Sequence, residues 1–202
     1  FLCGKSRESI EAGPYLEAMH ARGLEVLLLT EPVDEYVMQS INEYKEKKIV
    51  SADSDDFELE KLDQDEDADS LDEEKTKSLC EWLKEKLGDK VSGVETGERL
   101  IDSPVCIVGG DGPGGASARR MMKMMQGMGE SMPAPEVKLQ INPKHTIIRG
   151  LYEIRDTDEE TASLVADQLL DNAMASANLL DDPREMIARS YKALEKLASA
   201  SS

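Results

Sequence analysis

The sequence predicts an α+β protein with a small α/β unit over residues 1–52, an acidic linker over residues 53–74, and a mixed α/β domain over residues 75–202. Three observations predict this organisation. An unbroken aliphatic run at residues 26–29 lies among helical patterns, as in a strand wrapped by helices. Acidic residues concentrate in 53–74, and two long amphipathic stretches close the chain. The 202 residues suffice for two small domains with hydrophobic cores.

The first unit is predicted to contain three helices and one strand. Residues 6–10 and 14–22 are expected to be helical, with Ser6 as the cap of the first helix and Gly23 at the end of the second. Residues 24–29 predict a buried strand, because the aliphatic run leaves no polar face for solvent. Apolar residues then recur at helical spacing over 32–41, after a proline that favours a helix start.

The segment 53–74 is predicted to be a solvated linker. It holds thirteen acidic residues against Lys61 alone, a net charge of −12 out of −18 for the whole chain. Such a segment repels itself and has too few apolar groups to offset the entropy of ordering. A calcium loop is the alternative, but its regular carboxylate spacing and its glycine turn are missing.

The second part is predicted to combine a short sheet with helices. A helix over 72–87 carries an apolar stripe and is followed by Gly88. Strands over 91–100 and 104–108 are expected to be joined by a turn at Asp102 and Ser103. A glycine-rich loop over 109–115, a helix over 116–128, a strand over 137–141 and a helix over 144–154 complete this part.

The last two predicted helices, 158–179 and 183–198, should form an antiparallel hairpin with apolar side chains to spare. Either this surplus apolar side packs on the preceding sheet, or it meets a second copy in a dimeric four-helix bundle that buries about 1,600 Å² or more. The candidate interface residues are Leu164, Leu169, Ala173, Met174, Met186, Ile187, Tyr191, Leu194 and Leu197.

A glycine pattern offers an alternative function. Gly110, Gly112 and Gly115 follow a predicted strand with the spacing of a dinucleotide-binding loop, in which the backbone approaches a pyrophosphate. The context does not fit a dinucleotide-binding enzyme, because the next strand ends in Asn142 and Pro143 rather than in an acid that would hold a ribose. A plain loop is the preferred interpretation.

Methionines cluster in the predicted helix that follows this loop. On a helix, Met121, Met124, Met125 and Met128 share one face, whereas Met122 points away from it. The stripe could fill a core. However, glycines and prolines on both sides favour a segment that moves, and flexible thioethers suit a surface that binds varied apolar partners.

Composition excludes several classes of function. The net charge of −18 argues against binding to nucleic acid or to an anionic membrane. The three cysteines lie far apart, which favours neither a zinc site nor a disulfide framework and suits a reducing compartment. The two histidines, His20 and His145, fall in different predicted units, so no catalytic site is expected. The chain begins with Phe1, and we expect it to be part of a longer protein.

Several motifs, in order along nearly the whole chain, resemble the heat shock protein 90 chaperone family. The stretches 23–29 (GLEVLLL) and 31–36 (EPVDEY) are similar to the end of that family's middle domain. The acidic linker and the stretches 87–91 (LGDKV), 141–145 (INPKH) and 180–183 (LDDP) are similar to its C-terminal dimerisation domain.

This resemblance implies a homodimeric, ATP-driven chaperone whose ATP and Mg²⁺ site lies upstream of Phe1, so that this chain is itself no enzyme and holds no cofactor. It implies that the last two helices form the dimer interface and that unfolded client proteins contact Met121, Met122, Met124, Met125 and Met128. The last residues, Ala200, Ser201 and Ser202, match neither the family's tetratricopeptide-docking tail nor a retention signal of the endoplasmic reticulum. We therefore expect no tetratricopeptide co-chaperone and a bacterial cytoplasmic protein, or alternatively a mitochondrial or other organellar one.

Overall fold

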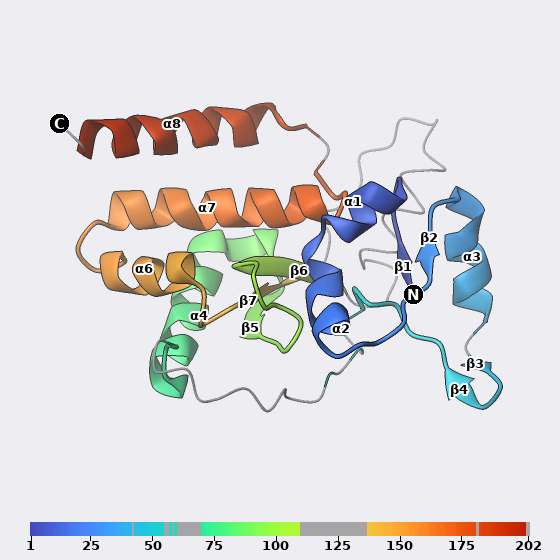
Figure 1. Ribbon diagram of the computed structural model, residues 1–202. Coiled ribbons are helices and arrows are strands. Elements are labelled where there is room, and N and C mark those ends of the chain that lie inside the picture. Colours follow the sequence, from blue (N-terminus) through green and yellow to red (C-terminus); the bar gives the residue numbers. More distant parts are fainter. Residues whose placement is uncertain are drawn as a thin grey trace.

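A computed structural model describes residues 1–41, 43–54, 57, 59, 70–109, 137–180 and 182–200 (Figure 1). Among these residues a three-stranded sheet lies at the centre, a long helix covers one of its faces, and a further helix lies outside that one. The N-terminal elements pack beside the sheet (Figure 1). The predicted α+β class is confirmed.

The N-terminal unit is built from short elements. They are β1 (Leu2–Cys3), α1 (Arg7–Glu11), the 3₁₀ helix η1 (Pro14–Leu16), α2 (Glu17–Ala21), β2 (Leu28–Leu29), α3 (Pro32–Ser40), β3 (Glu43–Tyr44) and β4 (Lys47–Lys48). Ser6 caps α1 as predicted, because its hydroxyl accepts a hydrogen bond from the Ser9 N–H at 3.2 Å. Pro32 stands at the first position of α3, where its missing N–H costs nothing.

The predicted buried strand over 24–29 is wrong. Only Leu28 and Leu29 pair, in parallel with Leu2 and Cys3, and the Leu27 side chain is 60% exposed. A strand is buried on both faces only when further elements cover it. In the described part of the chain, β1 alone flanks β2, so the aliphatic run does not become the centre of a sheet.

The C-terminal part contains the sheet and the long helices. Its elements are α4 (Glu73–Leu87), the 3₁₀ helix η2 (Gly88–Lys90), β5 (Gly93–Thr96), β6 (Val105–Gly109), β7 (Val137–Ile141), α6 (Thr146–Ile154), α7 (Glu159–Ser176) and α8 (Arg184–Ala200). Asp72, His145 and Asp158 cap α4, α6 and α7. Gly88 ends α4 with a φ of +57°, a conformation that favours glycine.

The strand order is β5-β7-β6, with β5 parallel and β6 antiparallel to β7. The two strands expected to follow each other across a turn are therefore separated by β7. The first of them, β5, is also shorter than expected, because residues 97–104 leave the sheet as a loop. We call this segment the 97–104 loop.

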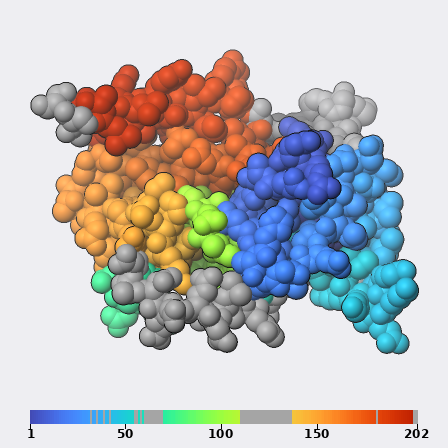
Figure 2. Space-filling view, in the orientation of Figure 1, coloured from blue at the N-terminus to red at the C-terminus, as the bar shows by residue number. Residues whose placement is uncertain are grey.

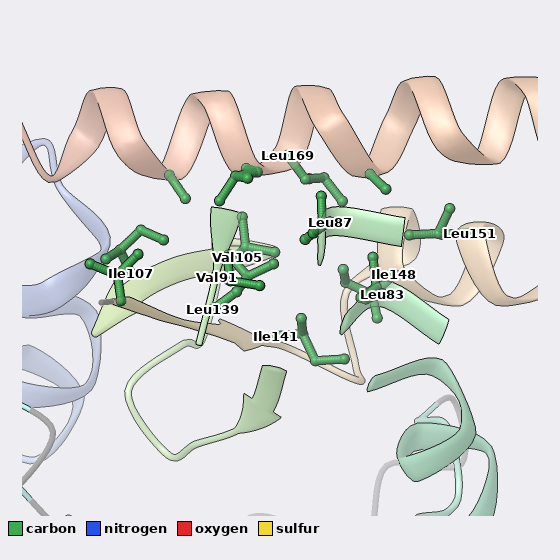
Figure 3. Close-up of a cluster of buried hydrophobic side chains, with 14 of the residues drawn as sticks. Leu83, Leu87, Val91, Val105, Ile107, Leu139, Ile141, Ile148, Leu151 and Leu169 are labelled. Atoms are coloured by element: carbon green, nitrogen blue, oxygen red, sulfur yellow. The ribbon is translucent and has the colours of Figure 1, made fainter. Parts of the chain in front are cut away.

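The two faces of the sheet carry two hydrophobic clusters. Along β6, Val105 and Ile107 join the cluster formed with α4, α6 and α7 (Figure 3). Cys106 and Val108 point the other way and join Leu2, Leu16 and Met19 of the N-terminal unit in a second cluster, which also contains Leu100. Successive side chains of a strand point to opposite faces. All five residues of β6 are buried, because both faces are covered.

The predicted solvated linker is wrong at its start, whereas at its end the helix predicted from residue 72 is confirmed. Asp53 and Ser54 are only 4% and 2% exposed, and Ser54 forms a β-bridge to Gly109. At the other end, Asp72 caps α4 and two glutamates form the first turn of that helix. Acidic side chains stabilise a helix start through the helix dipole, which explains why an acidic run ends in a helix. Residues 60–69 lie outside the described residues.

Candidate functional site

Helices α7 and α8 form the predicted hairpin at one edge of the molecule (Figure 1). Polar contacts join them along their length. Arg189 Nε donates to Asp171 Oδ2 at 2.6 Å, and Lys196 Nζ donates to Thr161 Oγ1 at 2.9 Å. Lys196 also pairs with Glu160 at 3.2 Å. The seam between the two helices is therefore held in large part by charged and polar side chains.

The side of α8 that faces α7 is only half-buried. Met186, Arg189, Ala193 and Lys196 recur at steps of three and four residues and are of intermediate exposure. No side chain of α8 that the structure describes is buried. A 17-residue helix without a buried side chain gains little from packing within one copy of the chain.

The outer side of α8 carries four large exposed apolar residues. Ile187, Tyr191, Leu194 and Leu197 are 45%, 64%, 56% and 68% exposed. Their spacing of four, three and three residues places them on one side of the helix. We call these four residues the α8 ridge. In the space-filling view, α8 lies along the upper edge of the molecule with its outer side uncovered (Figure 2).

The remaining predicted interface residues divide into two groups. Leu164, Met174 and Met186 are half-buried. Leu169 and Ala173 are 5% and 2% exposed and belong to the cluster that joins α7 to the sheet. Figure 3 shows Leu169 in this cluster. Sequence analysis left two possibilities for the apolar side of the last helices, packing on the sheet or contact with a second copy. Leu169 and Ala173 pack on the sheet. One copy of the chain already covers them, so they are not available to a partner.

A second exposed apolar surface lies on α3. Val33, Tyr36 and Val37 are 61%, 40% and 46% exposed, and Ile41, just beyond the helix, is 39% exposed. Helical spacing places these four residues on one side, which we call the α3 face. The same spacing predicted the helix from the sequence, without saying what its apolar side contacts. Periodicity identifies an apolar side and not what covers it.

Most of the other sequence-derived candidates lie outside the described residues, and one of them caps a helix. Gly110, Gly112 and Gly115 and the five methionines from Met121 to Met128 are outside the described residues. His145 Nδ1 accepts the Ile147 N–H at 3.1 Å, so this histidine serves as a helix cap. Within the ranges that the structure describes, no three His, Cys, Asp or Glu side chains are grouped to hold a metal, and no helix is long and apolar enough to span a bilayer.

A cleft of about 740 Å³ lies between the first half of α4 and residues 94–101. Both positively and negatively charged side chains line this cleft, so its charge favours neither an anionic nor a cationic ligand. The charged lining residues are Arg22, Glu73, Lys77, Glu95, Glu98 and Lys144.

The seam between the N-terminal unit and the sheet contains buried hydrogen bonds that sequence analysis missed. The Tyr15 hydroxyl donates to the Ile107 carbonyl at 2.8 Å. The Arg99 guanidinium, 2% exposed, donates to the carbonyls of Ala52 at 2.6 Å, Ser54, and Phe57 at 2.7 Å. Contacts across more than forty residues leave no local pattern in a sequence, so sequence analysis gave no signal for them.

Cys106 offers a test of this seam. Burial raises the pKa of its thiol to about 12, and the nearby Arg99 charge offsets this only in part. Because the thiolate is the reactive form, a raised pKa slows alkylation. At pH 8 we expect iodoacetamide to label Cys106 on the order of a thousandfold more slowly in the folded chain than in urea. Mass spectrometry of the labelled peptide measures the two rates, and similar rates would contradict the burial of β6 on both faces.

Comparison with known proteins agrees with this arrangement of features. The family described as "Hsp90 protein" matches residues 1–202. The chain is 37% identical over 205 residues to the chaperone protein HtpG of Desulfotalea psychrophila, covering 98% of this chain and 33% of that protein. It is 40% identical over 201 residues to HtpG of Desulfitobacterium hafniense, covering 97% and 31%.

The chain is also similar to a mitochondrial protein. The chain is 32% identical over 201 residues to the mitochondrial heat shock protein 75 kDa of Bos taurus, covering 97% of this chain and 29% of that protein. The chain thus spans about a third of the length of the curated relatives it matches. The match to the whole chain, at these identities, disfavours the dinucleotide-binding alternative. The chain belongs to the Hsp90 family.

Proposed function

We propose that this chain is the homodimerising and client-binding part of an ATP-driven chaperone. The observation that carries the proposal is the α8 ridge: four large apolar side chains exposed on a helix without a buried side chain. Monomeric proteins rarely leave such a contiguous apolar surface in water. Membership of a family whose relatives are named chaperones supports the same function.

A second copy is the partner that fits the ridge. A two-fold axis would place α8 against the α7–α8 hairpin of its twin, so that two hairpins form a four-helix bundle. The same ridge then serves both copies, and its Ile187, Leu194 and Leu197 leave water together. The net charge of −18 disfavours nucleic acid or an anionic membrane as the occupant.

In this proposal, dimerisation holds the distant ATP-binding parts of two protomers near each other. We propose that ATP and Mg²⁺ bind to a part of the protein upstream of the matched residues and that this chain performs no hydrolysis. A lasting joint at one end of two long protomers raises the effective concentration of their distant ends. Transient closure of those ends then becomes an intramolecular event.

Client proteins are proposed to bind apolar, adaptable side chains. The methionine segment from Met121 to Met128 supplies unbranched thioethers, which adjust to varied apolar partners. The α3 face offers a second exposed apolar surface in the same chain. We propose a bacterial cytoplasm as the site of action. The mitochondrial relative supports an organelle as the alternative.

Replacing methionines with serine tests client binding. The variant with Met→Ser at positions 121, 124, 125 and 128 should lose most of its ability to suppress the aggregation of an unfolded protein, because its apolar surface is removed. Light scattering of a heat-denatured reporter protein measures this ability. The matched control carries Met→Leu at the same four positions and should retain it.

Two further arms make the result decisive. The serine variant should keep the sedimentation mass of the parent, which separates client binding from dimerisation. A Val33→Ser, Val37→Ser variant in the same assay measures the share of the α3 face. If the methionine-to-serine variant holds the reporter as well as the parent does, the methionine segment is not the client site.

A further inference from the structure

The Glu17 carboxylate holds three consecutive peptide groups of the 97–104 loop. From the start of α2, Glu17 Oε2 accepts the N–H groups of Ile101 at 2.8 Å, Asp102 at 2.8 Å and Ser103 at 3.1 Å. The Ser103 hydroxyl donates to the other oxygen, Oε1. A run of N–H groups that converges on one anion is a strong and directional arrangement. These bonds connect residues 84 to 86 positions apart.

Asn142 holds the carbonyl of one of these peptides, that between Ile101 and Asp102, and the carbonyl of the peptide that follows them. Its Nδ2 donates to the carbonyls of Ile101 at 3.0 Å and Ser103 at 3.2 Å, and its own N–H donates to the Pro104 carbonyl at 2.9 Å. Asn142 is 4% exposed and directly follows β7. Glu17 therefore accepts hydrogen bonds from the N–H groups of the loop, while Asn142 donates hydrogen bonds to its carbonyls.

Asn142 also fixes the start of α6. Its Oδ1 accepts the Lys144 N–H at 3.0 Å, and its carbonyl accepts the His145 N–H at 3.1 Å. His145 caps α6, whose Ile148 is completely buried in the cluster shared with α7. A continuous set of hydrogen bonds thus leads from α2, through the loop, to the helices below the hairpin.

We propose that Glu17 and Asn142 are positioning residues that couple the placement of the N-terminal unit to the corner between β7 and α6. When Glu17 shifts, the three peptides that it holds must turn. The peptide between Ile101 and Asp102 carries both an N–H that Glu17 binds and a carbonyl that Asn142 binds, so the shift reaches Asn142 directly. The Arg99 guanidinium steadies the beginning of the loop by holding the carbonyls of the 52–57 segment. This coupling goes beyond the proposed function and requires neither a client nor ATP.

Hydrogen exchange of the intact chain tests the coupling. Glu17→Gln keeps the shape of the side chain and removes its charge, so exchange of the 101–103 amides should rise by about tenfold, as expected for the loss of one charge-assisted hydrogen bond. The coupling predicts that amides 148–151 of α6 also exchange faster. A purely local role would leave those α6 amides unchanged. Glu25→Gln, on an exposed glutamate of the same unit, is the matched control and should change neither region.

A substitution of Asn142 tests the coupling in the opposite direction. Since coupling between two sites is reciprocal, Asn142→Ala should raise exchange of amides 20–22, in the last turn and C-cap of α2. In the double variant the effects should combine to less than the product of the two single effects. If Asn142→Ala does not fold, Asn142→Ser takes its place. Exchange changes confined to each mutated side, or single effects that multiply fully, would overturn the proposal.

The result is independent of the dimer. The same exchange pattern is expected in a Leu194→Asp background, where the proposed interface is disrupted. A pattern that vanished in that background would show that α6 responds to the interface and not to Glu17, and would also overturn the coupling. Failure of dimerisation and failure of coupling are thereby distinguished.

Discussion

Leu169→Asp is expected to lower the free energy of unfolding by at least about 4 kcal/mol, because it places a charge without a partner in the centre of the α7–sheet cluster. Leu169 is 5% exposed and points from α7 toward the strands (Figure 3). Most domains are stable by only about 5–15 kcal/mol in total, so a loss of this size removes from about a quarter to most of the stability.

Urea denaturation followed by circular dichroism measures this loss. Leu169→Met is the control, since a substitution that conserves volume and polarity costs less than about 1.5 kcal/mol. A Leu169→Asp chain as stable as its parent, but monomeric, would show that Leu169 lies in a seam between copies and not in the core of one copy. That outcome would contradict the placement of α7 on the sheet.

Leu194→Asp, unlike Leu169→Asp, should leave the fold intact. It should raise the dissociation constant of the dimer at least about a hundredfold. Leu194 is 56% exposed in one copy, so an aspartate there remains solvated while the chain is alone. In the dimer each two-fold interface would bury two such charges, at a cost of several kcal/mol for charges without partners. Sedimentation equilibrium over a range of concentrations measures the dissociation constant.

Lys192→Asp is the matched control for this experiment. It introduces the same side chain on an exposed position of α8, away from the α8 ridge, and changes the net charge by more than Leu194→Asp does. We expect its dissociation constant to stay close to that of the parent. If Lys192→Asp dissociates the dimer as strongly as Leu194→Asp, general charge repulsion, and not the ridge, governs association.

Local features of the fold could be predicted from the sequence. Ser6, Asp72 and Asp158 cap helices through bonds to residues three positions away, and Gly88 ends a helix by its own backbone conformation. Such signals depend on neighbouring residues alone. Helix periodicity likewise located α7 and α8 and predicted the α8 ridge as an apolar side.

Features that depend on distant partners could not be predicted in this way. The order β5-β7-β6 places a strand from residue 137 onward between two earlier strands, which no local turn signal encodes. Asp53 belongs to an acidic run, yet it is buried because the segment crosses beside Gly109. Leu169 and Leu194 have the same helical periodicity, and only the sheet below α7 decides that the first is covered within one copy and the second is not.

The solution mass of the unmodified chain tests the central claim, which is that a twin covers the α8 ridge. Sedimentation equilibrium at high micromolar concentration should give a mass twice that of the 22.3 kDa chain, and dilution should yield a reversible transition to the single chain. A well-folded chain that keeps the mass of one copy at that concentration would contradict the claim.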